Sequence, residues 1–285
     1  MLVIIGAAVV LLAVVGGYLL EGGNLHVLFQ PAELVIIGGA AAGAFLISSP
    51  KAVVFAAFKG ALSTIKPARV NQETCLDLLR LLFELLSVAR REGIVALEPH
   101  LNAPRKSPIF GKHPRISSHH EVVEFLCDNF KLQLTGSVEP HQAEALMDLD
   151  IETQHAHGMK PSQAIAKVAD ALPGLGIVAA VLGVVLTMGK INEPPEVLGH
   201  SIGAALVGTF LGVLACYGFV GPLSTRLEHQ ARDHEALLNM VKAASVAWCN
   251  GWPPILSVES ARRAMPADLR PTFNELEQSL RNAKG

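Results

Sequence analysis

Four long stretches of the 285-residue chain contain no aspartate, glutamate, lysine or arginine, and this feature constrains the fold more than any other. They cover residues 1–20, 34–50, 171–189 and 197–225. A helix that crosses the hydrocarbon core of a bilayer needs about 20 apolar residues. The first, third and fourth stretches reach this length directly, and the second reaches it if its helix continues past Lys51 to Phe55. The sequence therefore predicts four transmembrane helices.

Composition supports a membrane protein, because 51% of the residues are hydrophobic and 17% are charged. The formal net charge of −2 gives no basic field for nucleic acid and no acidic tail. The four cysteines lack CxxC spacing, so we expect free thiols and neither a zinc site nor a disulfide framework. The first apolar stretch has no lysine or arginine before it and no small-residue cleavage pattern after it, which favours a retained helix over a secretory signal.

The basic residues predict the orientation of the chain. Of the 23 lysines and arginines, 14 lie between Lys51 and Lys167, eight follow Thr225, and one lies in the linker 190–196. The linker 21–33 has none. The positive-inside rule places both long polar segments in the cytoplasm and both short linkers outside. We therefore expect an all-α integral membrane protein with both termini in the cytoplasm and four transmembrane helices in two hairpins.

The expected organisation has four parts: transmembrane helices 1 and 2 (residues 1–55), a cytoplasmic helical region (56–168), transmembrane helices 3 and 4 (169–224), and a cytoplasmic helical extension (225–285). Apolar residues recur at helical spacing from Cys75 to Leu86, and Gly93 follows as a C-cap glycine. Residues 121–134 form a second amphipathic run, and four prolines between residues 99 and 114 predict a loop between the two helices. Residues 224–248 should continue the fourth helix.

Motifs of enzymes and cofactor-binding proteins are missing from the sequence. It has no GxxxxGK[ST], GxSxG or HExxH pattern, so we expect no catalytic residues, no cofactor and no metal site. Three glycine pairs stand four residues apart within the apolar stretches: Gly39 and Gly43, Gly199 and Gly203, and Gly208 and Gly212. Since no predicted strand precedes them, these pairs predict close helix packing and not dinucleotide binding.

Ion movement through a bilayer usually recruits ionisable side chains, and the predicted spans contain none that is acidic or basic. Apart from cysteine and tyrosine, the titratable candidate is His200, whose place at the outer end of the fourth span needs no proton-relay role. The chain alone is therefore expected to be a poor channel, with the carboxylate supplied by another subunit. A non-conducting scaffold is an alternative, whereas a secondary transporter would require broken helices or a polar substrate site.

Three motifs carry a resemblance to a known family: RREGIVALEPHL at residues 90–101, PGLGIVAAVLGVV at 173–185, and CYGFVGPL at 216–223. Together with four spans and a large cytoplasmic region, they make the chain similar along its whole length to the MotA family of flagellar motor stator proteins. The third span also resembles the ExbB and TolQ proton-channel proteins, which typically have three spans. An energy-transducing subunit of that kind is a further alternative.

The resemblance implies a stator unit in the bacterial inner membrane, surrounded by lipid. Five copies of the chain would enclose two copies of a single-span, peptidoglycan-binding partner similar to MotB, whose membrane aspartate would carry the proton. Proton flow would then rotate one ring against the other, and the cytoplasmic region would push on the rotor switch protein FliG. No nucleic-acid partner is expected.

The resemblance also assigns roles to individual residues. Arg90 and Glu98 match positions that contact the rotor through complementary charges, although exposed charges near a helix end need no such role. Pro173 and Pro222 match positions that couple proton binding to movement of the cytoplasmic part. A proline suits this role because it removes a backbone hydrogen bond and permits a hinge. The alternative is that both are ordinary prolines near helix ends.

Ala180 and Thr209 lie near the middle of the third and fourth spans, and both are expected to line the ion pathway at similar depth. Sodium needs several oxygen ligands, whereas a proton needs only the carboxylate and a short water path. Sodium-driven stators that resemble this family have a threonine where this chain has Ala180, so we expect proton coupling. Thr209 is either a single ligand or water contact, or a packing residue whose hydroxyl bonds back to the previous turn.

Overall fold

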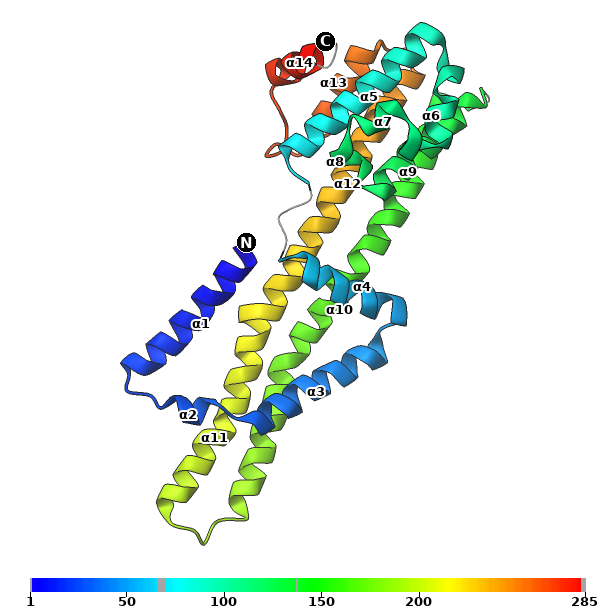
Figure 1. Ribbon diagram of the computed structural model, residues 1–285. Helices are drawn as coiled ribbons and strands as arrows, with labels where there is room; N and C mark the ends of the chain where they lie inside the picture. The colour runs from blue at the N-terminus through cyan, green and yellow to red at the C-terminus, as the bar shows by residue number, and fades with distance from the viewer. Residues whose placement is uncertain (1, 66–69, 137, 283–285) are drawn as a thin grey trace. The chain divides into compact units, whose positions relative to one another are not determined.

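The computed structural model describes residues 2–65, 70–136 and 138–282 (Figure 1). Every regular element within these ranges is a helix. The chain divides into two compact units, the first formed by residues 1–67 and 158–229 and the second by residues 68–157 and 230–285. Helices α10 (Pro140–Met188) and α12 (Gly221–Cys249) each contribute residues to both units.

Four helical segments are long and apolar enough to cross a membrane: α1 (Leu2–Leu20), Leu25–Ser48, α10, and Pro195–Cys249. This confirms the four predicted spans. Contacts within the chain do not locate the lipid boundaries, so the boundaries expected at residues 55, 168 and 224 stay predictions. No residue of α1 is buried by the rest of the single chain, as expected of a helix that faces lipid or further subunits.

The second span differs from its prediction. Helix α3 (Pro31–Ser48) ends before Pro50, and Ser49 has an extended backbone with φ −125° and ψ 135°. Helix α4 (Lys51–Ser63) then begins separately, so a continuous helix to Phe55 is wrong. The physical reason is that a residue before proline is disfavoured in the α conformation. The span gains its length at the other end, through the short helix α2 (Leu25–Leu28).

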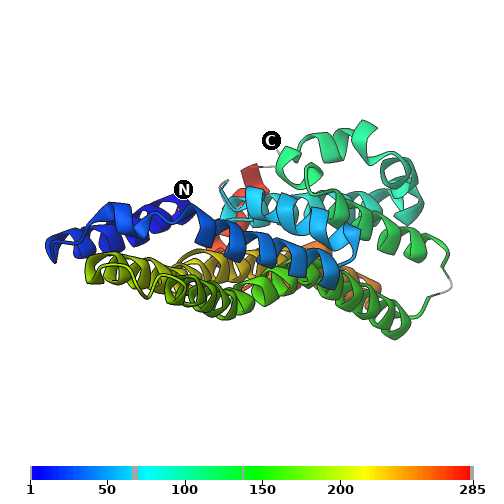
Figure 2. The same ribbon diagram turned by 90° about the horizontal axis from the view of Figure 1, so that it is seen from below.

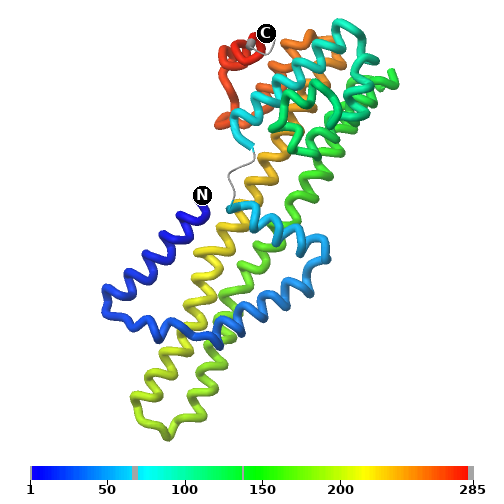
Figure 3. The backbone as a smooth tube through the Cα atoms, viewed as in Figure 1, coloured from blue at the N-terminus to red at the C-terminus, as the bar shows by residue number. Residues whose placement is uncertain are grey.

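Within the first unit, α11 (Pro195–Leu214) runs back alongside the end of α10 (Figures 2 and 3). A Cβ on Gly212 would lie 2.5 Å from the Leu172 carbonyl oxygen and 2.9 Å from the Gly176 Cα. A Cβ on Gly176 would lie 2.7 Å from the Gly208 carbonyl oxygen. The two backbones touch because these residues have no side chain. We call the set Gly176, Gly183, Gly208 and Gly212 the glycine seam.

The predicted packing role of Gly208 and Gly212 is thus confirmed. The other two glycine pairs, Gly39 with Gly43 and Gly199 with Gly203, have no atom of the described chain within 4 Å of an added Cβ. Equal spacing therefore does not imply an equal role within one chain. Only the pair that faces α10 brings two helices together here.

A π-helix, η3 (Ala215–Val220), interrupts the passage from α11 to α12. The Gly221 amide donates to the carbonyl of Cys216, five residues earlier. Pro222 has no amide hydrogen for the carbonyl four residues before it, which disfavours a regular α-turn at this point. A Cβ on Gly221 would lie 2.9 Å from the Cys216 oxygen, so glycine permits the close carbonyl. The predicted continuation of the fourth helix through residues 224–248 is confirmed, and the π-helix is an additional feature that the sequence does not reveal.

The second unit begins with α5 (Gln72–Glu92). The side chain of Asn71 caps its start by accepting a hydrogen bond of 2.9 Å from the Thr74 amide. Gly93 ends it with a φ of 89°, a conformation that favours glycine. This confirms the predicted C-cap. Helix α9 (His120–Leu134) confirms the second amphipathic run.

The proline-rich segment between α5 and α9 is not a plain loop, so that expectation is wrong. It forms five short helical turns: η1 (Ile94–Leu97), α6 (Glu98–Asn102), η2 (Pro104–Lys106), α7 (Pro108–Gly111) and α8 (Pro114–Ser117). Prolines occupy the first turn of four of them, where the missing amide hydrogen has no helical partner to lose. After α12, α13 (Pro254–Arg263) and α14 (Phe273–Asn282) complete the unit.

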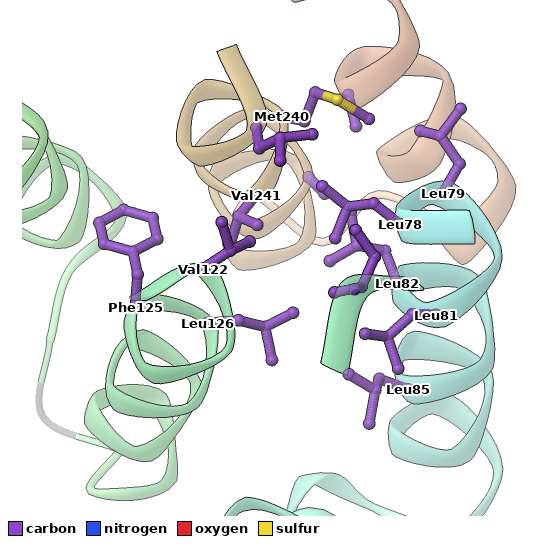
Figure 4. Packing of buried hydrophobic residues seen from close by; sticks show 14 of the residues in the cluster. Leu78, Leu79, Leu81, Leu82, Leu85, Val122, Phe125, Leu126, Met240 and Val241 are labelled. Atoms are coloured by element: carbon purple, nitrogen blue, oxygen red, sulfur yellow. The ribbon is translucent and has the colours of Figure 1, made fainter. Parts of the chain in front are cut away.

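Leucines of α5 form the centre of the second unit's core, where they meet Val122, Phe125 and Leu126 of α9 and Met240 and Val241 of α12 (Figure 4). Burying one leucine contributes about 1.5–3 kcal/mol. Cys75 and Cys127 belong to the same core, and burial raises the pKa of each thiol to about 12. Both thiols are therefore neutral at physiological pH and act as packing residues.

A buried histidine fastens the short turns to α5. The Nδ1 of His113 lies 2.8 Å from the Oδ1 of Asp77, and its Nε2 lies 3.3 Å from the Oε2 of Glu84. Lys112 pairs with the same Glu84. The ring is almost fully buried, so its two carboxylate contacts satisfy polar atoms that water cannot reach.

Substituting Gly212 with alanine should destabilise the first unit. The new Cβ meets backbone atoms of α10, which cannot rotate away, so the two helices must separate, at a cost of about 1–3 kcal/mol. Gly203→Ala on the same helix is the matched control, because its Cβ meets no atom within 4 Å. Thermal unfolding in detergent, followed by circular dichroism, should show a lower midpoint for G212A alone. Equal midpoints for the two variants would contradict the packing role of the glycine seam.

Candidate functional site

The structure places Ala180 and Thr209 on facing helices at neighbouring levels of the α10–α11 pair. A Cβ on Gly208 would lie 3.1 Å from the Ala180 amide nitrogen, and one on Gly176 would lie 3.3 Å from the Thr209 Cα. Both residues are partly exposed in the single chain. The glycine seam thus sets the level of the two residues predicted to line an ion pathway.

The hydroxyl of Thr209 makes no hydrogen bond within the part of the chain that the structure describes. Thr187, by contrast, bonds back to the carbonyl of Gly183 at 2.8 Å, as threonines in apolar helices commonly do. The packing alternative for Thr209 relied on such a bond, which is not made. The Thr209 hydroxyl is therefore available to water or to an ion.

Pro173 lies inside α10 and leaves the carbonyl four residues earlier without its helical donor. Its neighbour Leu172 contacts α11 at Gly212, and the π-helix η3 begins three residues later, at Ala215. Pro222 follows directly in the first turn of α12. The two helices therefore lose regular hydrogen bonding at about the same level, a coincidence that the sequence does not reveal.

Two serines hold the same helices together on the other side of this level. The Ser162 hydroxyl donates to the Ser224 carbonyl and the Ser224 hydroxyl donates to the Ser162 carbonyl, each at 3.0 Å. Both serines are buried. The interrupted stretch thus lies between this serine pair and the glycine seam.

The expectation that the spans contain no acidic residue is wrong. Glu33 lies in the first turn of α3, inside the apolar segment Leu25–Ser48, and is only 7% exposed. Its Oε2 lies 2.5 Å from where a Cβ of Gly208 would be, and its Oε1 lies 3.5 Å from that of Gly183. A count of charge-free residues begins the second span at Leu34, so it places Glu33 in the linker before the span. His200, the titratable candidate from the sequence, is exposed.

Arg90 and Glu98 belong to the second unit. Arg90 lies in the last turn of α5, and Glu98 is the first residue of α6. Both are exposed, and among the described residues neither has an ion-pair partner. Leu97 and Leu101 are buried and anchor the intervening turn. Arg90 and Glu98 therefore flank a turn that has buried anchors, and both side chains are exposed.

An apolar residue that the sequence analysis did not single out lies between these charges. Val95, in η1, is 66% exposed. It lies between Arg90 and Glu98 in the sequence, on the turn that Leu97 anchors. The available signal was the run IVAL directly after Gly93, in which Leu97 is buried and Val95 is not.

The polar side chains at the level of Gly208 are the Glu33 carboxyl and the Thr209 hydroxyl, whereas the nearby Thr187 hydroxyl is bonded within its own helix. Within the described ranges, no three histidine, cysteine, aspartate or glutamate side chains are arranged to hold a metal ion. A dehydrated cation needs several oxygen ligands, whereas a proton needs one acceptor and a short water path. The chemistry of this chain's own residues therefore suits a proton better than a metal cation.

Comparison with known families gives matches over most of the chain. Residues 4–93 match the family model described as Motility protein A N-terminal. Residues 118–240 match the model described as the MotA/TolQ/ExbB proton channel family. The second match contains Pro173, Ala180, Thr209 and Pro222, and the first contains Glu33 and Arg90.

Individual relatives extend over the full length. Motility protein A of Escherichia coli strain K12 is 38% identical over 284 residues, covering 100% of this chain and 96% of that protein. Chemotaxis protein LafT of Vibrio parahaemolyticus is 36% identical over 281 residues, covering 99% of both. Two solved structures, each 22% identical, share the fold. C. jejuni MotAB has a TM-score of 0.78 over 95% of this chain and 98% of that chain. The flagellar MotAB stator complex from Bacillus subtilis has a TM-score of 0.76 over 96% of this chain and 99% of that chain. The chain therefore belongs to the motility protein A family, within the MotA/TolQ/ExbB proton channel family.

Proposed function

We propose that this chain is a stator subunit of the bacterial flagellar motor. With a MotB-like partner it forms a proton-conducting complex that converts proton motive force into torque on the rotor. The observation that carries the proposal is the packing of glycine against glycine between two charge-free stretches, α10 after Asp170 and α11 after Glu196, in a chain related to Motility protein A from end to end. The function is that of a multi-pass inner-membrane channel subunit and not of an enzyme.

The proposed assembly has five copies of this chain around two copies of a single-span, peptidoglycan-binding partner. In each copy of this chain, the four spans form two hairpins, both termini lie in the cytoplasm, and the C-terminal extension is helical. Two faces of the single chain support an assembly in lipid: α1 has no buried residue, and Ile177, Val181 and Val185 of α10 are exposed. Apolar surfaces of this extent need lipid or further subunits to cover them.

The proposed coupling begins at the partner's aspartate, opposite Ala180 and Thr209. A change in the charge of that aspartate would bend α10 and the α11–α12 passage at Pro173 and Pro222. The serine pair and the glycine seam limit the movement to the interrupted stretch between them. Arg90 and Glu98 would then pass the movement to FliG, because rim charges mainly set the orientation and rate of a contact that forms and breaks repeatedly.

The first test of this proposal removes the partner. A complex purified from membranes should contain the single-span partner, and the chain reconstituted alone should give no proton flux. Glu33 does not change this expectation, because one carboxyl group at one level of the membrane does not complete a pathway without the partner's aspartate. Proton flux into vesicles should appear when both subunits are present. Flux with a normal pH response from the chain alone would contradict the shared pathway.

The second test concerns the rotor contact. Arg90→Glu and Glu98→Lys should each lower torque, because attraction to the rotor becomes repulsion. Glu152→Lys is a matched reversal at an exposed position elsewhere in the second unit and should leave torque unchanged. Torque is measured from tethered cells, and proton flux from a complex whose channel is held open. Loss of flux in R90E or E98K would place these residues in the pathway or the fold and not at the rotor.

The third test identifies the coupling ion. The methyl group of Ala180 offers no oxygen, and Thr209 offers one, so a sodium ion would lack ligands. Flux in reconstituted vesicles, and swimming speed, should follow the proton gradient and persist when potassium replaces sodium at constant pH. If rotation stops when sodium is removed, the ion is sodium and Thr209 becomes one of its ligands.

A further inference from the structure

The carboxyl group of Glu33 is buried and has no polar partner. Its Oε2 is inaccessible to solvent and makes no hydrogen bond to any described residue. The residue as a whole is 7% exposed and lies in an apolar helical segment. A buried polar atom without a partner is unusual in a folded protein and requires an explanation.

A capping role does not explain this position. Glu33 is the third residue of α3 after the cap residue Gln30, where a glutamate can bond back to the cap amide. That bond is not made, and the Gln30 side chain donates instead to the carbonyl of Val27 at 3.1 Å. The Glu33 side chain leaves its own helix terminus and reaches the glycines of α10 and α11.

Neighbouring charges do not explain it either. The elements packed against α3 include α4, α10, α11 and η3, and Phe45 near its end packs against a cluster that contains Leu227 of α12. The titratable groups of these elements nearest the membrane segments are Lys51 and Lys59 on α4, Glu196 and His200 on α11, Cys216 and Tyr217 on η3, and Arg226 and Glu228 on α12. Helix α10 has none between Asp170 and its end at Met188, and His26 lies on the preceding α2. None of these forms an ion pair with Glu33 within the described ranges. An ionised carboxylate would therefore be buried without compensation.

The carboxyl lies beside the residues expected to line the pathway. The Cβ position of Gly208 is 2.5 Å from the Glu33 Oε2 and 3.1 Å from the Ala180 amide nitrogen. Thr209 is the next residue in α11. The carboxyl therefore lies at the level of both residues expected to line the pathway.

We propose that Glu33 is a proton-binding site of the stator, held between Gly183 and Gly208. Its carboxylate accepts a proton from water, is stored as a neutral carboxyl group, and releases the proton to the next water in the pathway, so that the group is unchanged after each transfer. Protonation removes the charge that the site cannot compensate. The inference rests on the proposed function for the route of the proton, but the bound proton itself can be tested without flux.

Infrared spectroscopy tests the bound proton directly. The full complex in vesicles at neutral pH should show the carbonyl band of a protonated carboxylic acid, and the difference spectrum between wild type and Glu33→Gln should contain this band. Glu196→Gln, which removes an exposed acidic residue of α11, is the matched control and should leave the band in place. Absence of this band from the difference spectrum between wild type and E33Q would overturn the proposal.

Proton flux tests the role in transfer. E33Q should lower flux by roughly 100-fold, the low end of what a positioned proton-transfer group contributes. Glu33→Asp should retain part of the flux, and E196Q should match wild type. Wild-type flux in E33Q, with the complex assembled, would overturn the role, whereas absence of flux in wild type would count against the proposed function and leave the infrared result to decide on Glu33.

A steric variant separates the carboxyl from its position. In Gly208→Ala the new Cβ would lie 2.5 Å from the Glu33 Oε2 and 3.1 Å from both the Ala179 Cβ and the Ala180 amide nitrogen. The flexible Glu33 side chain is displaced most, whereas α10 has to give by only a few tenths of an ångström. This variant should lower flux and weaken the infrared band while Glu33 itself is retained. Gly203→Ala is the control on the same helix. If G208A leaves both measurements at wild-type values, the position between the two glycines is irrelevant and the proposed site is wrong.

Discussion

Close contact between the backbones of α10 and α11 is the constraint on which the rest of the first unit depends. In lipid, apolar side chains gain little by leaving the hydrocarbon, so helices associate through dense packing of small residues. The glycine seam supplies this packing at Gly176, Gly208 and Gly212. It sets Ala180 opposite Gly208, keeps the level of Pro173 close to that of η3, and leaves the space that the Glu33 carboxyl enters.

Much of this architecture follows from the sequence because each signal is local. Stretches without charges long enough for a bilayer define the spans, and Asn71 and Gly93 mark both ends of α5 through the polar side chain of one and the positive φ of the other. The level shared by Ala180 and Thr209 follows from their places near the middle of antiparallel helices. The exposed charges of Arg90 and Glu98 follow from their position at a helix end.

Other features depend on contacts that the order of residues does not contain. Gly39 and Gly43 have the same spacing as Gly208 and Gly212, yet only the second pair faces another helix of the same chain. A charge normally ends a span, so Glu33 was read as linker, and only the glycines of α10 and α11 show that its carboxyl is enclosed. Pro50 indicates the break before α4, because a residue before proline disfavours the α conformation. The apolar residues 52–55 nevertheless favour the prediction of a continuous helix.

The π-helix η3 determines the direction in which the side chains of the following helix α12 point around the helix axis. A π turn holds one residue more than an α turn, and removing it would rotate the following residues by roughly 100° about the helix axis. Leu227 now packs with Ala57 and Ile165, 3.0 Å from the Cβ position of Gly60. In an uninterrupted helix of the same sequence, the charged Arg226 would take that place, and Leu223 would replace Ser224 opposite Ser162. The single extra residue thus shifts the helix phase by about one position. As a result, the same helix faces α10 with Gly208 and Gly212 before Pro222 and with Ser224 after it.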